Sequence, residues 1–130
     1  LDNMFFTTFS AWVNYKEMAL TYSTAGHPAQ YLLSPKRNQI IRLKNKGIPL
    51  CINLKTEYEE SKITFNHGDK LIMFREGIFE CFNDNGEKFG ENRLRKLLEE
   101  NIHLNPEDLK QKIVKANQDL AEVKYRFKTN

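Results

Sequence analysis

Residues 70–80 read Lys-Leu-Ile-Met-Phe-Arg-Glu-Gly-Ile-Phe-Glu, so an apolar run delivers a carboxylate, Glu76, and a glycine, Gly77, at its C-terminal end. A carboxylate fixed at the end of a buried strand can bind a hard divalent cation, and the glycine beside it leaves room for water or a phosphate oxygen. An ordinary strand that ends in a polar turn has the same local pattern. The segment therefore predicts either a metal site or a plain strand end.

Four further blocks of distinctive sequence accompany this segment. They are Met-Phe-Phe-Thr-Thr-Phe at residues 4–9, Tyr-Ser-Thr-Ala-Gly-His-Pro-Ala-Gln at 22–30, Lys-Gly-Ile-Pro-Leu at 46–50 and Glu-Cys-Phe-Asn-Asp-Asn-Gly-Glu-Lys-Phe-Gly at 80–90. In order and spacing, the blocks resemble the SpoIIE/RsbU-type phosphatases of bacteria, a branch of the metal-dependent PPM (type 2C-like) protein serine/threonine phosphatases. That family shows Met-Phe-x-Thr, Ala-Gly-His-Pro, Gly-x-Pro-Leu-Gly, a buried strand ending in Asp-Gly-x-x-Glu, and Asn-x-x-Gly-x-x-Phe-Gly. The ordered set covers residues 4–120 and corresponds to the C-terminal two-thirds of the family's domain.

The resemblance implies a particular chemistry. In the PPM family, two manganese or magnesium ions are held by acidic residues at strand ends, and a metal-bound water attacks the phosphorus of a phosphoserine or phosphothreonine. The implied substrate is a phosphorylated regulatory protein, such as an anti-sigma-factor antagonist. His27 belongs to the family's Ala-Gly-His-Pro signature and is the candidate catalytic residue. A neutral imidazole in a strand-end turn can instead satisfy local backbone groups.

The metal ligands that the resemblance implies are only partly present. The family's central Asp-Gly falls on Glu76 and Gly77, which keeps a carboxylate on an arm longer by one methylene. Its late Asp-Asp-x-Thr motif falls on Ala-Glu-Val-Lys at residues 121–124, where Ala121 cannot bind a metal and Glu122 is the acid that is left. The expected metal-binding residues are therefore Glu76, Gly77 and Glu122.

Two functions from different classes follow. The first is a SpoIIE/RsbU-like serine phosphatase that uses Mn²⁺ or Mg²⁺. The second is a non-catalytic pseudophosphatase, or a fragment of the domain, that serves as a protein-interaction domain and binds no metal. Neighbouring dications repel each other until negative ligands offset them, and the family's opening region with its further aspartate has no counterpart before Leu1. We therefore predict a member of the phosphatase family whose activity is weak or absent.

Composition limits the class of protein. The chain has 130 residues, of which 40% are apolar and 28% charged, so it is long enough for one globular domain, residues 1–130, and too short for two. Its 20 basic residues are interspersed with 17 acidic ones, and the net charge of +3 does not indicate nucleic-acid binding. Cys51 and Cys81 lack a Cys-x-x-Cys spacing, which fits reduced thiols in the cytoplasm. No apolar run reaches the roughly 18 residues needed to cross a membrane.

Hydrophobic periodicity predicts strands in the first part of the chain. Alternating or β-preferring segments occupy residues 4–13, 18–23, 31–33, 40–43, 58–65 and 71–74. The first four form two hairpins through polar connections, and the turn Asn-His-Gly-Asp at 66–69 predicts that the last two segments also pair with each other. Trp12 and the nine phenylalanines are predicted to fill a sandwich core.

After Gly90 the hydrophobic period becomes that of a helix. One set of apolar residues shares a first helical face and another set a second face: Leu94, Leu97, Leu98 and Ile102, then Leu109, Ile113, Ala116 and Leu120. Asn105 followed by Pro106 predicts the start of the second helix, and alternation at residues 123–127 predicts a final strand.

These elements indicate an α+β fold. The resemblance implies the PPM architecture, an antiparallel β-sandwich flanked by helices, here expected to lack its N-terminal strands. An incomplete sandwich exposes sheet edges, so a homodimer is also expected.

Overall fold

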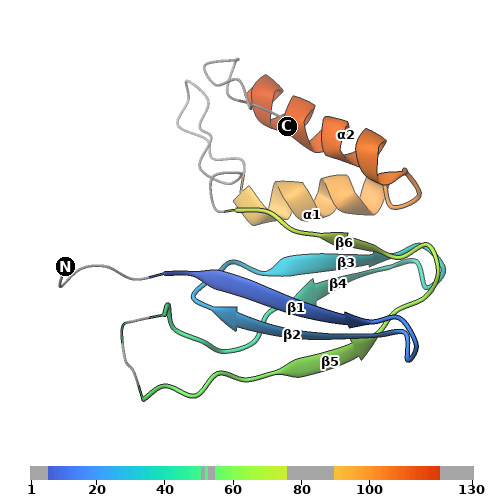
Figure 1. The fold of residues 1–130 in the computed structure, drawn as a ribbon. Helices are drawn as coiled ribbons and strands as arrows, with labels where there is room; N and C mark the ends of the chain where they lie inside the picture. The colour runs from blue at the N-terminus through green and yellow to red at the C-terminus, as the bar shows by residue number, and fades with distance from the viewer. Residues whose placement is uncertain (1–5, 51, 53–54, 76–89, 121–130) are drawn as a thin grey trace.

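The computed structural model of the chain describes residues 6–50, 52, 55–75 and 90–120 (Figure 1). Within these ranges, regular secondary structure consists of six strands and two helices. In chain order they are β1 (Thr8–Asn14), β2 (Ala19–Ala25), β3 (Gln30–Ser34), β4 (Gln39–Leu43), β5 (Ser61–Thr64), β6 (Lys70–Ile72), α1 (Gly90–Glu100) and α2 (Pro106–Leu120). The predicted α+β composition is confirmed, and the strand predicted at 123–127 lies outside the described residues.

The strands form two antiparallel sheets. One has the order β1-β2-β5 and the other the order β4-β3-β6. The hairpins β1–β2 and β3–β4 are the two that the sequence predicts. In the first hairpin, the side-chain oxygen of Asn14 accepts hydrogen bonds from the backbone N–H groups of Lys16 and Glu17 at 3.0 and 3.1 Å, which fixes the turn.

The predicted pairing between residues 58–65 and 71–74 is wrong. Strand β5 pairs with β2, and β6 pairs with β3, so the turn at 66–69 carries the chain from one sheet to the other. Ile63 and Phe65 nevertheless join Leu71 in one apolar cluster between the sheets. The two segments therefore face each other through side chains across the sandwich and share no backbone ladder.

Side chains from both sheets fill the space between them. Leu20 and Tyr22 of β2 meet Leu32 of β3 and Leu43 of β4, and all four are buried. Phe9 of β1 stacks on Tyr22 with a centroid separation of 6.0 Å. This cluster joins the β1-β2-β5 and β4-β3-β6 sheets into a sandwich, as predicted for the fold class.

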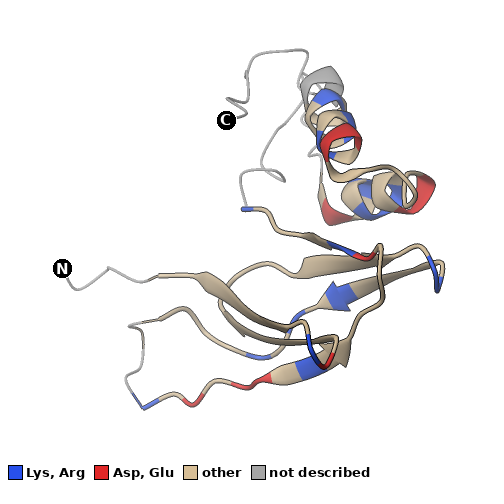
Figure 2. Ribbon diagram, turned by 45° about the vertical axis from the view of Figure 1, so that its right-hand side comes forward, with Lys and Arg blue, Asp and Glu red and all other residues tan. Residues whose placement is uncertain are grey.

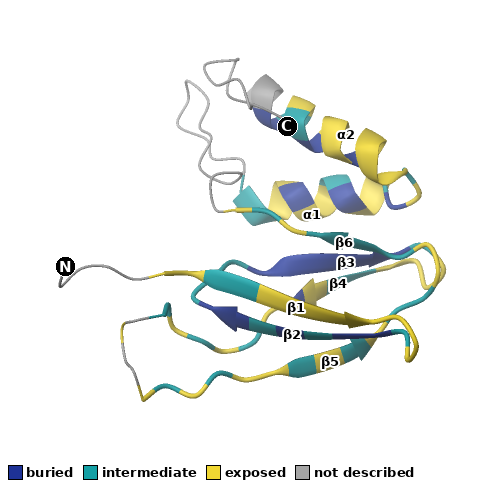
Figure 3. Ribbon diagram, in the orientation of Figure 1, coloured by how far each residue is buried: buried dark blue, intermediate teal, exposed yellow. Residues whose placement is uncertain are grey.

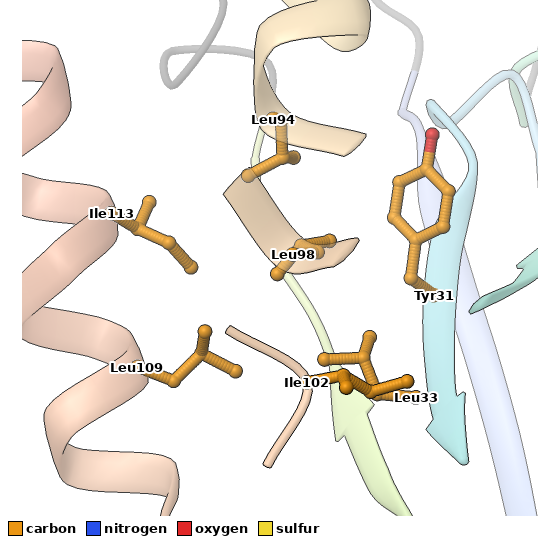
Figure 4. Packing of buried hydrophobic residues seen from close by; sticks show 7 residues of the cluster. All are labelled: Tyr31, Leu33, Leu94, Leu98, Ile102, Leu109 and Ile113. Carbon is orange, nitrogen blue, oxygen red and sulfur yellow. The ribbon is translucent and has the colours of Figure 1, made fainter. Parts of the chain in front are cut away.

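The two helices cover the outer face of the β4-β3-β6 sheet (Figure 1). Figure 4 shows how seven buried side chains from the sheet, the two helices and their connection meet: Tyr31, Leu33, Leu94, Leu98, Ile102, Leu109 and Ile113. The predicted start of α2 is confirmed, because the Asn105 side chain accepts a hydrogen bond from the N–H of Asp108 at 2.9 Å. The helical periodicity of the sequence therefore identifies the buried faces correctly.

A polar contact adds to this packing where α1 begins. The hydroxyl of Tyr31 on β3 donates a hydrogen bond to the Glu91 carboxylate, and Arg42 Nε on β4 donates to the same oxygen at 2.8 Å. The Arg42 guanidinium lowers the pKa of Glu91, and burial together with Glu91 raises the pKa of Tyr31. The first turn of α1 is thus held to two strands by one shared carboxylate oxygen.

The outer face of the β1-β2-β5 sheet carries a residue that the sequence analysis placed wrongly. Trp12 was predicted to lie in the core, but it is 78% exposed. In the hairpin register, Ser10, Trp12 and Asn14 alternate with the residues that face the other sheet. No element among the described residues covers this side of β1, whose exposed stretch is visible in Figure 3.

The segment that leads toward Glu76 is also less buried than predicted. Regular strand β6 ends at Ile72, and Met73 is 62% exposed. In the sheet order β4-β3-β6, β6 is an edge strand, so only β3 supports it within the described structure. Phe74 still packs inward, because its ring stacks on Tyr31 with centroids 6.0 Å apart.

Replacing Leu98 by alanine tests the packing of the helices on the sheet. Leu98 is fully buried in the cluster of Figure 4, so Leu98→Ala should lower the free energy of unfolding by about 2–5 kcal/mol. The exposed neighbour Glu99 provides the control, and Glu99→Ala should change stability by less than about 0.5 kcal/mol. Urea unfolding followed by circular dichroism measures both, and equal effects would contradict the described core.

The shared carboxylate predicts a pH-dependent contribution to stability. Glu91→Gln should lower the free energy of unfolding by about 1 kcal/mol at neutral pH, since the carboxylate is partly exposed. Because the folded-state pKa of Glu91 lies below its usual 4.5, this contribution is present above that value and is lost as the pH falls through the folded pKa. Urea unfolding at several pH values should therefore show the two proteins converging in acid, and a difference that persists there would contradict the assignment.

Candidate functional site

Three of the distinctive sequence blocks meet at one end of the sandwich. Phe6 and Leu50 exchange backbone hydrogen bonds with N···O distances of 3.1 and 2.6 Å. Thr8 forms a bridge with Gly26, and the N–H of Gly26 donates to the carbonyl of Gly47 at 2.8 Å. Backbone hydrogen bonds therefore join segments that are more than forty residues apart in the chain.

Close backbone approach explains the glycines of two blocks. Gly26 adopts a left-handed conformation with φ of +64°, and a Cβ there would lie 2.4 Å from Cγ of Pro49. At Gly47, a Cβ would lie 2.1 Å from the carbonyl oxygen of Thr24. Any side chain at either position would push the loop after β4 away from the end of β2.

Asn45 holds the same loop through its side chain. Its amide oxygen accepts hydrogen bonds from the N–H and the hydroxyl of Thr24 at 2.8 and 2.7 Å. Its amide nitrogen donates to the carbonyl oxygens of Tyr22 and Glu59 at 3.2 and 3.0 Å. Asn45 was not predicted from the sequence, because an asparagine in a polar connection looks like an ordinary loop residue.

A buried glutamine ties the Ala-Gly-His-Pro turn to the end of β6. Gln30 is fully buried, and its side-chain oxygen accepts a hydrogen bond from the N–H of Phe74 at 2.6 Å. Because a backbone N–H can only donate, the amide nitrogen of Gln30 must point the other way. It lies 3.0 Å from the carbonyl oxygen of Pro28 and 3.1 Å from Nδ1 of His27.

His27 is held in this turn through one ring nitrogen. Its Nδ1 lies 3.1 Å from the carbonyl oxygen of Pro28 and 3.1 Å from the amide nitrogen of Gln30. Nδ1 donates to Pro28 or accepts from Gln30 according to which ring nitrogen carries the proton. In either case Nε2 has no hydrogen-bond partner among the described residues.

The start of β1, the turn after β2 and the segment after β6 line a cavity of about 330 Å³. Its described lining consists of Thr7, Thr8, Phe9, His27, Gln30, Met73, Phe74 and Arg75. The lining carries a guanidinium, an imidazole, an amide and two hydroxyl groups, and none of these eight residues has a carboxylate. Charged residues are otherwise concentrated on the helices and loops, as Figure 2 shows.

The predicted site residues are only partly within the described structure. His27 lines the cavity, as does Arg75, which directly precedes Glu76 in the sequence. Glu76, Gly77 and Glu122 lie outside the described residues, so the predicted metal site stays a prediction. Among the residues that the structure describes, no three His, Cys, Asp or Glu side chains come together in a way that could hold a metal ion. Nor does the described part of the chain contain a helix long and apolar enough to span a membrane.

Comparison with known proteins identifies relatives of most of the chain. The sequence model of the family described as stage II sporulation protein E (SpoIIE) matches residues 1–125. The phosphoserine phosphatase RsbU of Bacillus subtilis (strain 168) is 35% identical to the chain over 101 residues. That match covers 77% of this chain and 30% of RsbU, so the chain spans less than a third of that relative's length.

Solved structures with the same fold come from SpoIIE of Bacillus subtilis. The PP2C phosphatase domain of SpoIIE with a fragment of its regulatory domain superposes with a TM-score of 0.68 at 16% identity, over 90% of this chain and 34% of that one. The SpoIIE phosphatase domain presoaked with Mn superposes with a TM-score of 0.62 at 15% identity, over 95% of this chain and 52% of that one. These likenesses show the fold, and the family match shows the relationship. The chain therefore belongs to the SpoIIE/RsbU-type family of PPM phosphatases.

Proposed function

We propose that this chain is part of a phosphoserine phosphatase domain that acts on a phosphorylated regulatory protein, and that its own hydrolytic activity is weak or absent. The family membership and the name of the RsbU relative support the phosphoserine substrate. The chain spans between a third and about half of the SpoIIE structures that it matches, so the activity of a complete domain is part of the proposal.

The observation that carries this function is the meeting of the family blocks around one cavity. His27 comes from the turn after β2, and the hydroxyls of Thr7 and Thr8 come from the start of β1. The buried Gln30 amide connects that turn to Phe74, two residues before the position of the family's central aspartate. Such an arrangement suits a site that receives a phosphorylated side chain at the end of a strand.

The acidic residues support the weak or absent hydrolysis. Divalent ions, when bound, supply Lewis-acid chemistry and an activated water in this class of enzyme. Glu76, Gly77 and Glu122 are the residues that would hold Mn²⁺ or Mg²⁺ here. The described lining instead contributes the positive charge of Arg75, and Ala121 takes the place of an expected acid. Fewer negative ligands mean weaker retention of two neighbouring dications.

The proposed partner is a protein of the anti-sigma-factor antagonist class, met in the bacterial cytoplasm. A second copy of the chain is a further proposed partner, since β1, β5, β4 and β6 are edge strands within the described sheets. The alternative function is a non-catalytic interaction domain that recognises the same class of protein. The lack of any carboxylate among the described cavity residues favours this alternative.

Metal binding and hydrolysis measured together test the proposal. We expect the 130-residue chain to bind Mn²⁺ weakly by calorimetry and to hydrolyse an aryl phosphate or a phosphoserine protein slowly or not at all. The double variant Glu76→Asp with Ala121→Asp restores the family's acids and should raise Mn²⁺ affinity about tenfold or more. The change Glu99→Asp, on the exposed side of α1, serves as the matched control and should have no effect.

Three outcomes distinguish the phosphatase function from the interaction-domain alternative. Saturable binding of two Mn²⁺ ions with turnover in the unchanged chain would show that hydrolysis is not impaired. Gain of turnover in the double variant would show that the missing acids alone limit the activity. A double variant that stays inactive would show that restoring these two acids is not enough for hydrolysis.

A further inference from the structure

The cavity beside His27 has the donor chemistry of an oxyanion site. We propose that it binds the phosphate group of a phosphoserine side chain directly and without a metal ion, through Arg75, His27 and the hydroxyls of Thr7 and Thr8. This inference rests on the proposed function, because that function names a phosphoserine protein as the partner. It adds a binding mode that does not depend on the carboxylates that hydrolysis would need.

The charge of the described lining favours an anion. Arg75 contributes a guanidinium, and none of the eight described lining residues contributes a carboxylate. A guanidinium attracts a phosphate dianion and repels a divalent cation at the same position. Within the described part of the chain, Arg75 is exposed and makes no hydrogen bond or ion pair. Its planar fork is therefore available for two parallel hydrogen bonds to phosphate oxygens.

The position of His27 lets its ring add a donor to the site. Nδ1 is engaged within the turn, 3.1 Å from both the Pro28 carbonyl oxygen and the Gln30 amide nitrogen. Nε2 has no hydrogen-bond partner among the described residues, and it can donate to a phosphate oxygen when it carries the proton.

The size and rim of the cavity favour a phosphorylated side chain over free phosphate. A volume of about 330 Å³ lies at the lower end of the range of small-molecule sites, about 300–1,000 Å³, and is ample for a phosphorylated serine. Met73, one of the lining residues, is 62% exposed, and Phe6, next to Thr7 in the sequence, is 58% exposed. Apolar side chains next to the phosphoserine of a partner would pack against Met73 and Phe6.

Titration of the full chain in EDTA tests the proposal. The probes are a capped leucine-phosphoserine-leucine tripeptide, its unphosphorylated form and inorganic phosphate, and binding is followed by NMR shifts of the Thr7, Thr8 and Arg75 signals. We expect saturable binding of the phosphorylated tripeptide, weaker binding of inorganic phosphate and none of the unphosphorylated form.

Three variants assign the binding to the guanidinium. Arg75→Gln should weaken binding of the phosphorylated tripeptide by about 10- to 100-fold, and Arg75→Lys should weaken it less, because it keeps the charge but loses the fork. The matched control Arg95→Gln removes an exposed arginine of α1 and should leave the affinity unchanged. Equal loss in both glutamine variants would show only a general effect of net charge and would overturn the proposal.

Metal dependence separates this proposal from the proposed function. Glu76→Gln removes a negative charge next to Arg75 in the sequence, so it should tighten metal-free binding, whereas a metal-bridged phosphate should bind more weakly in this variant. Binding that requires Mn²⁺ and disappears in EDTA would overturn direct recognition and leave the phosphatase function standing. Inorganic phosphate that binds as tightly as the tripeptide would overturn the assignment to a phosphoserine side chain. Slow or absent hydrolysis with metal-free binding intact would support both proposals.

Discussion

A buried primary amide has to satisfy both its donor and its acceptor inside the protein, and the end of the sandwich that carries the cavity is organised around one such group. Gln30 accepts from the backbone of Phe74 and donates to the carbonyl of Pro28. Leaving either end unpaired would cost about 1–3 kcal/mol, so the turn after β2 and the segment after β6 are kept in one relative position. The ring of His27 is held in the same turn, since its Nδ1 lies 3.1 Å from both the Pro28 carbonyl oxygen and the Gln30 amide nitrogen.

The fold could be predicted from the sequence wherever one short segment contains all the information. Leu94 and Leu98 repeat with the period of a helix, and Asn105 with Pro106 marks a helix start, so both helices lie where they were expected. Hairpins are also local, because β1 and β2 are joined by a short turn. The partner of β5 is not local information: Ile63 and Phe65 show that one face is apolar but not which sheet that face belongs to. The prediction that Trp12 lies in the core was wrong for a similar reason, since an aromatic residue in a strand does not reveal which of the two sheet faces is covered.

Only those residues of the candidate site that lie in a distinctive sequence motif could be predicted as functional. His27 was found because it belongs to a distinctive motif, and it does line the cavity. Asn45 and Gln30 were missed, because a polar residue in a loop or at a strand start looks solvated until the chain folds around it. Their partners, Thr24 and Phe74, lie 21 and 44 residues away, beyond the reach of periodicity or spacing. One available signal was Gln30 itself, the polar first residue of β3, directly before three apolar residues.

The packing at this end of the sandwich and the charge of the cavity rest on different residues. The fold at this end depends on glycines and amides, and a Cβ at Gly26 or Gly47 would clash with Pro49 or Thr24. The charges that would decide between a cation and an anion are separate from that scaffold and can change without disturbing it. Arg75 is such a charge, since it is exposed, follows the end of β6 and makes no hydrogen bond or ion pair within the described part of the chain. The packing around Gly26 and Gly47 therefore places no constraint on the sign of the charge in the cavity, and that sign would favour an anion or a cation.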